Sequence, residues 1–243
     1  MAVFTEESVK ANIRTRDGKR VFYLADSDRL TPSARQWLQR ERIQVLPAAM
    51  AKPSVYRTLH GLELTEKPEY MTHLRADVLV NKDHPRIRFR GCVDQLEAEL
   101  LLAGHYAGTL GKNGIAADLN EVLELVRMVI RCDVLEEPLH TTQICGLTLE
   151  QIREHSHFPQ KYNDTPHFMP KISDSSLLLV LNRVRTCIRQ TELAAYDAFR
   201  DRDGAVTRPD ILTVFNRMSS LLWLLMIRMK REECHGTELG TAD

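Results

Sequence analysis

The chain has 243 residues, of which 43% are hydrophobic, and its 33 lysines and arginines are matched by 33 aspartates and glutamates. A net charge of zero argues against general nucleic-acid binding, which requires a basic excess, so any bound anion must be held by a local cluster of cations. The hydrophobic content is enough for a packed core, and eleven glycines and ten prolines are too few for a fibrous or low-complexity protein.

The cysteines, the opening residues and the most apolar stretch all favour a protein of the cytoplasm. The five cysteines are scattered, with no C-x-x-C pair, and the opening residues MAVFTEESVK do not have the order of a signal peptide. The most apolar stretch, residues 218–229, is shorter than the roughly 20 residues that span a bilayer. We therefore expect a reduced protein that binds no membrane, with a buried helix at 218–229.

The first 53 residues are predicted to form a small α+β unit. Residues 21–24 (VFYL) and 43–46 are expected strands. Residues 30–42 between them predict a helix with Thr31 as its cap and Pro32 at its first position. Residues 51–71 are interpreted as a linker with turns, so the segment 54–82 separates this unit from the rest of the chain.

From residue 83 to residue 243 the pattern predicts a helical bundle. Apolar residues recur at helical spacing in five segments, which are residues 86–106, 119–135, 148–155, 174–200 and 209–231. Asp118, Thr148 and Thr207 are the expected caps of the second, third and fifth segments. The predicted fold class is mainly α, with a bundle of about five helices, four of them long.

The connection from residue 155 to residue 171, HSHFPQKYNDTPHFMPK, is unusual for a loop. It contains three prolines, three histidines, two phenylalanines and a tyrosine. Ordinary connectors are shorter and more polar, so this loop is expected to cover a ligand or a surface. Its histidines could instead bind a metal, but no carboxylate stands at ligand spacing, which favours ordinary loop histidines.

Arg185, Arg189 and Glu192 share one face of the predicted 174–200 helix, because they are spaced i, i+4 and i+7. Taken alone, such a trio is most often a solvated stripe with an ion pair. The opposite face of this helix is strongly apolar, however, and Asn216 begins a polar group on the next helix. Cations that converge inside a bundle need an anion.

A polyphosphate is the anion that these residues fit. Arg189 provides a planar fork for phosphate oxygens, and Lys82 provides a mobile point charge. Asp94 is a candidate partner for one of the arginines. The chain has no P-loop, because the segment at residues 108–112 (GTLGK) lacks the required spacing, and it has no dinucleotide fingerprint.

Three motifs in register resemble those of PduO-type ATP:cobalamin adenosyltransferases. The motifs are Thr72-His-Leu with Lys82-Asp-His-Pro-Arg86-Ile and Gly91-Cys-Val-Asp94, Arg185-Thr-Cys-Ile-Arg189-Gln-Thr-Glu192, and Phe215-Asn216-Arg217-Met218-Ser219-Ser220. The ethanolamine-utilisation branch of the family is more similar, through Leu30-Thr-Pro-Ser-Ala-Arg35, His60-Gly-Leu62, Lys67-Pro and His167-Phe-Met-Pro170.

The resemblance implies an oligomer, with a trimer favoured, that binds ATP at subunit interfaces. ATP would contact Thr72, His73, Lys82, Arg86, Arg189, Glu192 and Asn216, of which Lys82, Arg189 and Glu192 would be catalytic. Asp94 and Arg185 would form a structural salt bridge, and cobalamin would contact Phe158, Tyr162, His167, Phe168 and Met169.

The implied reaction transfers the 5′-deoxyadenosyl group of ATP to cob(I)alamin and releases triphosphate. Cobalt(I) is a strong nucleophile, so the protein has only to orient the 5′ carbon, neutralise the triphosphate with the help of Mg²⁺ and exclude water. A side chain of the loop, one of Phe158, Phe168 or Met169, would displace the lower ligand of cobalt(II). The branch implies a role in ethanolamine utilisation, with transfer to ethanolamine ammonia-lyase and a place in a bacterial microcompartment.

Some members of this branch carry a cysteine-rich, metal-binding insert where this chain has only Glu63-Leu-Thr-Glu66, so no cysteine-bound transition metal is expected. Three alternatives remain open. A cobalamin carrier would keep the aromatic loop but would not need the cations. A phosphohydrolase would use the loop histidines for a metal. A purely structural scaffold is the third alternative, but it would not explain why Arg185, Arg189 and Glu192 share one helix face.

Overall fold

The computed structural model describes residues 2–16, 19–50 and 56–238, and it divides the chain into two compact units. The first unit comprises residues 1–57 and 62–66, and the second comprises residues 58–61 and 67–243. Each unit has its own hydrophobic core. The structure is mainly α, as the periodicity of the sequence predicts.

The first unit is a small α+β structure. Its elements are β1 (Val3–Phe4), α1 (Glu6–Ala11), β2 (Arg14–Arg16), β3 (Lys19–Leu24), β4 (Arg29–Leu30), α2 (Pro32–Arg40), β5 (Gln44–Pro47) and the short 3-10 helix η1 (Ala48–Met50). Strand β3 lies between β2, which is antiparallel to it, and β5, which is parallel. Phe22 and Leu38 form the core with Val9, Ala34 and Ile43.

The predictions for this unit are confirmed where they depend on local signals. The Thr31 hydroxyl accepts the Ala34 N–H at 3.3 Å and caps α2, and Pro32 is its first residue. Strands β3 and β5 match the two predicted strands. In the segment interpreted as a linker, residues 51–55 lie outside the described residues, and β6 (Tyr56–Thr58) and β7 (Glu63–Leu64) form an antiparallel hairpin.

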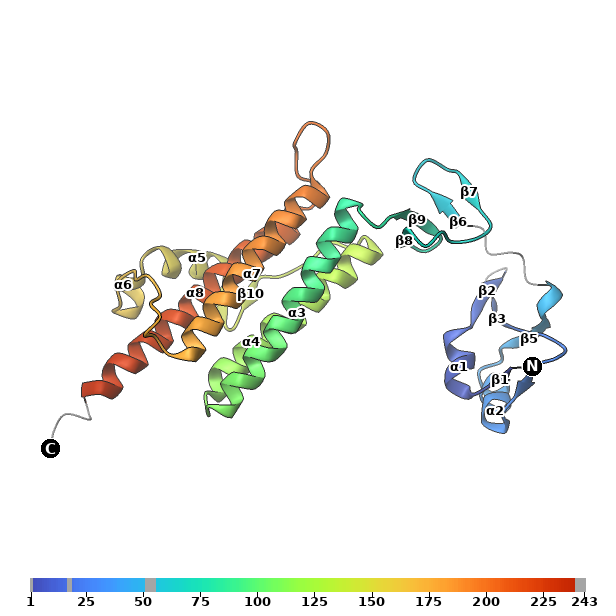
Figure 1. The fold of residues 1–243 in the computed structure, drawn as a ribbon, viewed down its shortest axis with the longest axis horizontal. Helices are drawn as coiled ribbons and strands as arrows, with labels where there is room; N and C mark the ends of the chain where they lie inside the picture. The colour runs from blue at the N-terminus through green and yellow to red at the C-terminus, as the bar shows by residue number, and fades with distance from the viewer. Residues whose placement is uncertain (1, 17–18, 51–55, 239–243) are drawn as a thin grey trace. The chain divides into compact units, whose positions relative to one another are not determined.

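The second unit begins with a hairpin and continues as a helical bundle (Figure 1). Strands β8 (Met71–Arg75) and β9 (Val78–Asn81) pair antiparallel, with Thr72 opposite Val80. The four long helices are α3 (Pro85–Thr109), α4 (Asn113–Leu135), α7 (Ser176–Phe199) and α8 (Pro209–Glu238). Between α4 and α7 the chain forms β10 (Gln143–Ile144), β11 (Leu147–Thr148), α5 (Leu149–His157) and α6 (Pro159–Asn163).

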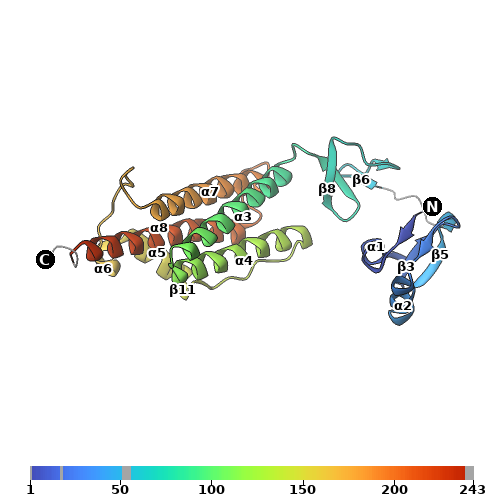
Figure 2. The same ribbon diagram turned by 60° about the horizontal axis from the view of Figure 1, so that its bottom comes forward.

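Figures 1 and 2 show the long helices of this unit side by side. Helix α3 packs against α4 and α7, α7 packs against α8, and α5 covers α8. At one end, the ring of Phe89 contacts Phe199 and Phe215 edge to face at 5.3 and 5.9 Å. Such aromatic pairs add about 0.5–1.5 kcal/mol each beyond the area that they bury.

Helix α8 contains the apolar stretch that the sequence predicts to be buried. Among the described helices, its segment Pro209–Glu233 is the one whose length and composition would allow it to cross a membrane, and 61% of its most apolar window is buried inside the protein. The packing of α8 against α7 and α5 accounts for this apolar composition.

The starts of two helices and the expected cap of a third differ from the prediction. Helix α4 begins at Asn113, so Asp118 lies within it and instead accepts a hydrogen bond from Arg228 at 2.6 Å. Helix α7 begins at Ser176 rather than at Asp174, and the hydroxyl of the preceding Ser175 accepts the Leu178 N–H at 3.3 Å. Helix α8 begins at Pro209 as predicted, but the expected cap Thr207 donates its hydroxyl to the carbonyl of Phe199 at 2.7 Å. Thr148 caps α5 as predicted, in a capping box with Gln151.

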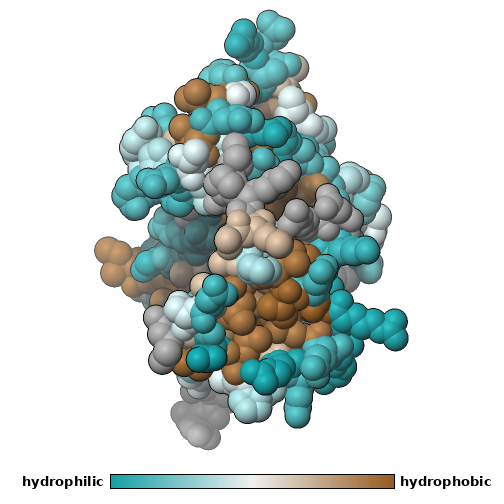
Figure 3. All heavy atoms as spheres, turned by 90° about the vertical axis from the view of Figure 1, so that its right-hand side faces the viewer, coloured by the Kyte–Doolittle hydropathy of each residue, from teal (hydrophilic) through white to brown (hydrophobic). Residues whose placement is uncertain are grey.

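Some apolar side chains reach the surface. Figure 3 shows hydrophobic residues at the surface, among hydrophilic ones. In the second unit, Leu101 and Leu102 on α3 and Leu193 on α7 are 52%, 59% and 67% exposed. Scattered apolar residues at a surface are normal, whereas several on adjacent helices are typical of an interface.

Candidate active site

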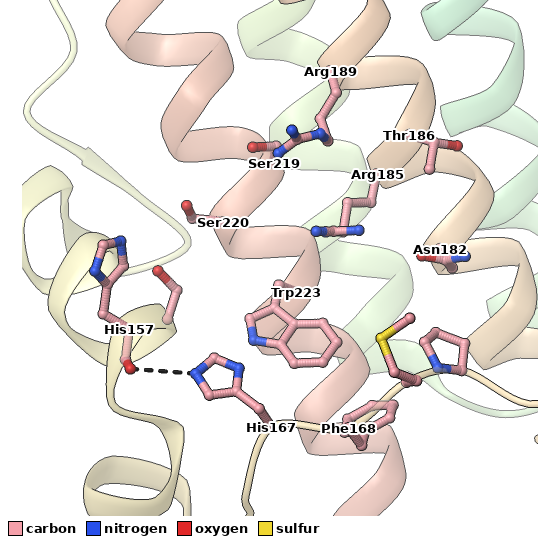
Figure 4. A pocket seen from close by; sticks show the side chains of 13 residues that line it. His157, His167, Phe168, Asn182, Arg185, Thr186, Arg189, Ser219, Ser220 and Trp223 are labelled. Atoms are coloured by element: carbon pink, nitrogen blue, oxygen red, sulfur yellow. Dashed lines mark hydrogen bonds between the residues drawn. The ribbon is translucent and has the colours of Figure 1, made fainter.

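A cavity of about 620 Å³ lies between α7, α8, the end of α5 and the loop that precedes α7 (Figure 4). Helix α7 contributes Asn182, Arg185, Thr186 and Arg189, and α8 contributes Ser219, Ser220 and Trp223. The loop contributes His167, Phe168, Met169 and Pro170, and α5 contributes Ser156 and His157. The cavity therefore joins the predicted arginine face of α7 to the aromatic loop.

One side of the cavity is cationic. Arg185 and Arg189 lie one helical turn apart on α7, and no carboxylate is among the described residues that line the space. Burial lowers the pKa of the Arg185 guanidinium from its ordinary value, and the neighbouring charge of Arg189 lowers it further. The charge of an anion bound here would offset both effects, because it would stabilise the two adjacent guanidinium groups in their charged form.

The other side of the cavity is aromatic. Trp223 lies beside the guanidinium of Arg185, with 5.7 Å between the ring centroid and the central guanidinium carbon. Phe168 packs on Trp223 at 4.8 Å, and the His167 ring lies parallel to it at 5.9 Å. The His167 Nε2–H donates to the carbonyl of His157 at 3.3 Å, which fixes the loop to the end of α5. Met169 is 82% exposed at the cavity.

A chain of hydrogen bonds continues the cationic side along the two helices. The Arg217 Nη1–H donates to Asn216 Oδ1 at 2.5 Å, and Asn216 Nδ2 donates to Glu192 Oε1 at 3.0 Å. Glu192 is three residues from Arg189 on α7, so both lie on the same face. The structure thus brings Arg185, Arg189, Glu192 and Asn216 together on neighbouring turns of two packed helices.

The predicted nucleotide-binding residues of the hairpin do not line this cavity. Thr72 and His73 lie on β8, and the His73 Nδ1–H donates to the carbonyl of Ala76 at 2.9 Å. Lys82 follows β9, and its ammonium group lies 3.1 Å from Glu69. Arg86 lies at the start of α3, where its guanidinium binds Asp133 at 2.6 Å.

Asp94 and Arg185 do not form an ion pair within this chain, in the part that the structure describes. Asp94 is exposed on α3, and Arg185 is half-buried against Trp223. The predicted salt bridge between them therefore stays a prediction about two subunits.

Two of the predicted cobalamin-binding residues lie elsewhere in the fold. Phe158, between α5 and α6, lines a second cavity of about 410 Å³ together with His157 and Arg217. The Tyr162 ring stacks on His155 at 4.2 Å, and its hydroxyl bonds to Glu154. Within the ranges 2–16, 19–50 and 56–238, no three side chains of His, Cys, Asp or Glu meet as metal ligands.

Trp223 is a residue of this site that the sequence did not predict, because residues 218–229 indicate only a buried run. A signal was present: Trp223 stands seven residues after Asn216 and four after Ser219, so the three share a helix face. The buried helix predicted at residues 218–229 is confirmed, since Leu221, Leu222, Leu225 and Met226 are at most 4% exposed.

Comparisons with known proteins identify the family of this chain. A family model described as cobalamin adenosyltransferase matches residues 64–229. The corrinoid adenosyltransferase EutT of Salmonella typhimurium strain LT2 is 30% identical over 251 residues, which cover 92% of this chain and 90% of that protein. EutT of Escherichia coli strain K12 is 32% identical over the same shares. The chain therefore belongs to the cobalamin adenosyltransferase family, as an adenosyltransferase of the EutT type.

Proposed function

We propose that this enzyme transfers the 5′-deoxyadenosyl group of ATP to cob(I)alamin and releases triphosphate. The observation that carries the proposal is the cavity itself. Its wall has two guanidinium groups and no carboxylate among the described residues on one side, and Trp223, Phe168 and His167 on the other. The cationic side suits a polyphosphate, and the aromatic side suits a large flat ring.

The reaction needs no general base, because cobalt(I) attacks the 5′ carbon while the carbon–oxygen bond to triphosphate breaks. The leaving triphosphate takes the electron pair, so the main demand on the protein is to stabilise negative charge. Arg189 meets that demand from within the cavity, and Lys82 is assigned the same role. Magnesium prefers one or two carboxylates together with substrate phosphates, which fits Glu192 beside Arg189 and would neutralise part of the triphosphate charge.

The ATP site requires a second copy of the chain. Thr72 and Lys82 lie on the β8–β9 hairpin and its exit, and they do not line the cavity that contains Arg189. In an oligomer, with a trimer favoured, the hairpin of one subunit would complete the site of the next, and Asp94 would pair with Arg185 across the same boundary. The exposed Leu101, Leu102 and Leu193 support an interface on α3 and α7.

The loop prepares the corrinoid for reduction. An apolar side chain that displaces the lower axial ligand makes cobalt(II) easier to reduce to cobalt(I). Phe168 and Met169 line the cavity, whereas Phe158 lines the neighbouring one. We assign the displacement to Phe168 or Met169.

The experiment that tests the proposal is an anaerobic incubation with ATP, Mg²⁺, cobalamin and a reductant, followed by the visible spectrum of the cobalt–carbon bond. The expected result is adenosylcobalamin in an amount that depends on ATP. Tight binding of cobalamin without any product would contradict catalysis and would indicate a carrier. Omission of ATP is the control.

The names of the relatives support a role in ethanolamine utilisation. The product would pass to ethanolamine ammonia-lyase, in the cytoplasm and within a bacterial microcompartment. A strain that lacks this protein should fail to grow on ethanolamine with unmodified cobalamin and should recover when adenosylcobalamin is supplied. Undiminished growth of that strain on unmodified cobalamin would contradict the role.

A further inference from the structure

Asp133 is a fully buried carboxylate at the end of α4 that no part of the proposed reaction uses. Two arginines of α3 bind it. The Arg86 Nε–H and Nη2–H donate to Oδ1 at 2.9 and 2.6 Å, and the Arg90 Nε–H donates to Oδ2 at 2.7 Å. Arg86 also donates to the backbone carbonyl of Asp133 at 2.7 Å. Both carboxylate oxygens are therefore occupied.

The same arginines extend to the β8–β9 hairpin. The Arg90 Nη1–H donates to the backbone carbonyl of His73 on β8 at 3.4 Å. Arg75, the last residue of β8, forms an ion pair with Glu136, and Arg86 Nη1 lies 3.5 Å from the same carboxylate. Thr72 precedes His73 on this strand. The bundle thus holds the strand through charged groups that converge on Asp133 and Glu136.

The geometry leaves Arg86 little freedom to act as a phosphate ligand. Its side chain is only 16% exposed, its donors face Asp133 and Glu136, and its guanidinium lies 5.7 Å from the Phe199 ring centroid. Arg90 is similarly enclosed at 18% exposure, and its Nη2 is buried without a hydrogen-bond partner in the described structure.

A buried ion pair is weak evidence for stability, because apolar residues of similar volume often stabilise a core as well. Charged groups are better suited to fixing one geometry, since a bidentate guanidinium is directional. We propose that Asp133 is a positioning residue: it orients Arg86 and Arg90 so that the hairpin presents Thr72 and Lys82 to ATP. The proposal rests on the proposed function, in which these two residues bind the nucleotide.

The test compares two variants by steady-state kinetics with each substrate varied in turn. Asp133→Asn keeps the size of the side chain but removes its charge. Arg90→Lys keeps a positive charge near Asp133 but loses the fork that joins Asp133 to the His73 carbonyl. In both variants we expect the KM for ATP to rise by about tenfold and kcat to fall, because Lys82 would no longer be aligned with the leaving triphosphate, while the KM for cob(I)alamin stays within about twofold of the wild type.

The matched control is Asp210→Asn. Asp210 accepts hydrogen bonds from Arg208 and from the Leu139 N–H, both at 2.8 Å, and these bonds tie α8 to the segment after α4. No described contact joins this pair to the hairpin. The control should lower the melting temperature and leave the KM for ATP unchanged. All assays are run where circular dichroism shows each variant to be folded.

Two results would overturn the inference. One is a wild-type KM for ATP in both folded variants, and the other is an equal rise of the KM for both substrates. If Asp133→Asn does not fold, the KM for ATP of Arg90→Lys alone tests the inference. The wild-type assay comes first, because absence of ATP-dependent product there contradicts the proposed function, whereas an active wild type with unaffected variants contradicts only the role of Asp133.

Discussion

Asn216 Nδ2 on α8 donates a hydrogen bond to Glu192 Oε1 on α7 at 3.0 Å, and this bond fixes the carboxylate next to the arginine face. Asn216→Asp would replace the donor with a second carboxylate against Glu192. Like charges at this distance repel, so we expect the KM for ATP to rise by about tenfold. Kinetic assays check this. Asn120→Asp, the same change at an exposed position of α4, should have no effect, and equal behaviour of the two variants would contradict the role of Asn216.

Arg189→Ala should lower kcat by about 100- to 1000-fold, the usual cost of removing a group that stabilises charge in a transition state. Its effect on stability should be small, because Arg189 is exposed and, in the described structure, pairs with no carboxylate. The control is Arg183→Ala on the same helix, which removes a pair with Glu99 at 2.6 Å outside the cavity. Turnover of Arg189→Ala at the level of this control would show that the triphosphate is bound elsewhere.

Trp223→Ala removes the aromatic surface on which Phe168, His167 and Arg185 pack. We expect a rise in the KM for cob(I)alamin of about tenfold and a smaller change in the KM for ATP, because the loop loses its support. Trp223→Phe should retain part of the function, which separates packing from loss of folding. Trp37→Phe in the first unit serves as the control for tryptophan replacement. The role of Trp223 is refuted by an unchanged KM for cob(I)alamin in a folded Trp223→Ala protein.

Acid should destabilise the link between the start of α7 and the end of α8. The hydrogen bond from Lys230 lowers the pKa of Asp174, and the Lys171 N–H contributes to the same shift. A lowered pKa in the folded state stabilises the fold above the unfolded pKa, near 3.9, and this contribution disappears as the pH falls through the folded value. Thermal unfolding between about pH 5 and pH 2 should therefore show a steeper loss for the wild type than for Asp174→Asn. Parallel curves would argue against the link.

Activity should not require a tightly bound transition metal. After treatment with a chelator and dialysis, Mg²⁺ alone should restore full turnover, because the proposed role of the ion is to share the charge of triphosphate. Metal analysis of the purified enzyme provides the second measurement. Activity that returns only with zinc or iron, in stoichiometric amount, would refute this expectation.

Local signals in the sequence were sufficient to predict much of the fold. Thr148 and Gln151 form the capping box of α5, and Thr31 and Pro32 begin α2, since these residues act on their own backbone. The start of α4 could not be predicted in the same way. Asp118 resembles a cap, but its carboxylate binds Arg228, which is 110 residues away. The short strands β8 and β9 also depend on pairing that no single segment reveals.

In the candidate site, too, the sequence predicts some residues and not others. Helical spacing predicts that Arg185, Arg189 and Glu192 share one face. In the structure Arg185 and Arg189 line the cavity, and Glu192 lies one turn further on, bound to Asn216. The spacing of the residues in the loop could not predict which of them face the cavity and which face elsewhere. Tyr162 stacks on His155 and Phe158 turns to the second cavity, because the turns around α6 set their directions. The buried position of Asp133 could not be predicted from its local sequence, since its partners Arg86 and Arg90 lie more than 40 residues earlier in the chain.

Arg185 touches the aromatic side of the cavity, and Arg189 forms its cationic side, one turn further along α7. The offset between the two substrate regions is therefore about 6 Å along the axis, and it is set by helix pitch rather than by a loop. One residue inserted between these arginines would rotate Arg189 by about 100° and carry it out of the cavity. The spacing of the two substrate regions therefore tolerates no change in the length of α7 between Arg185 and Arg189.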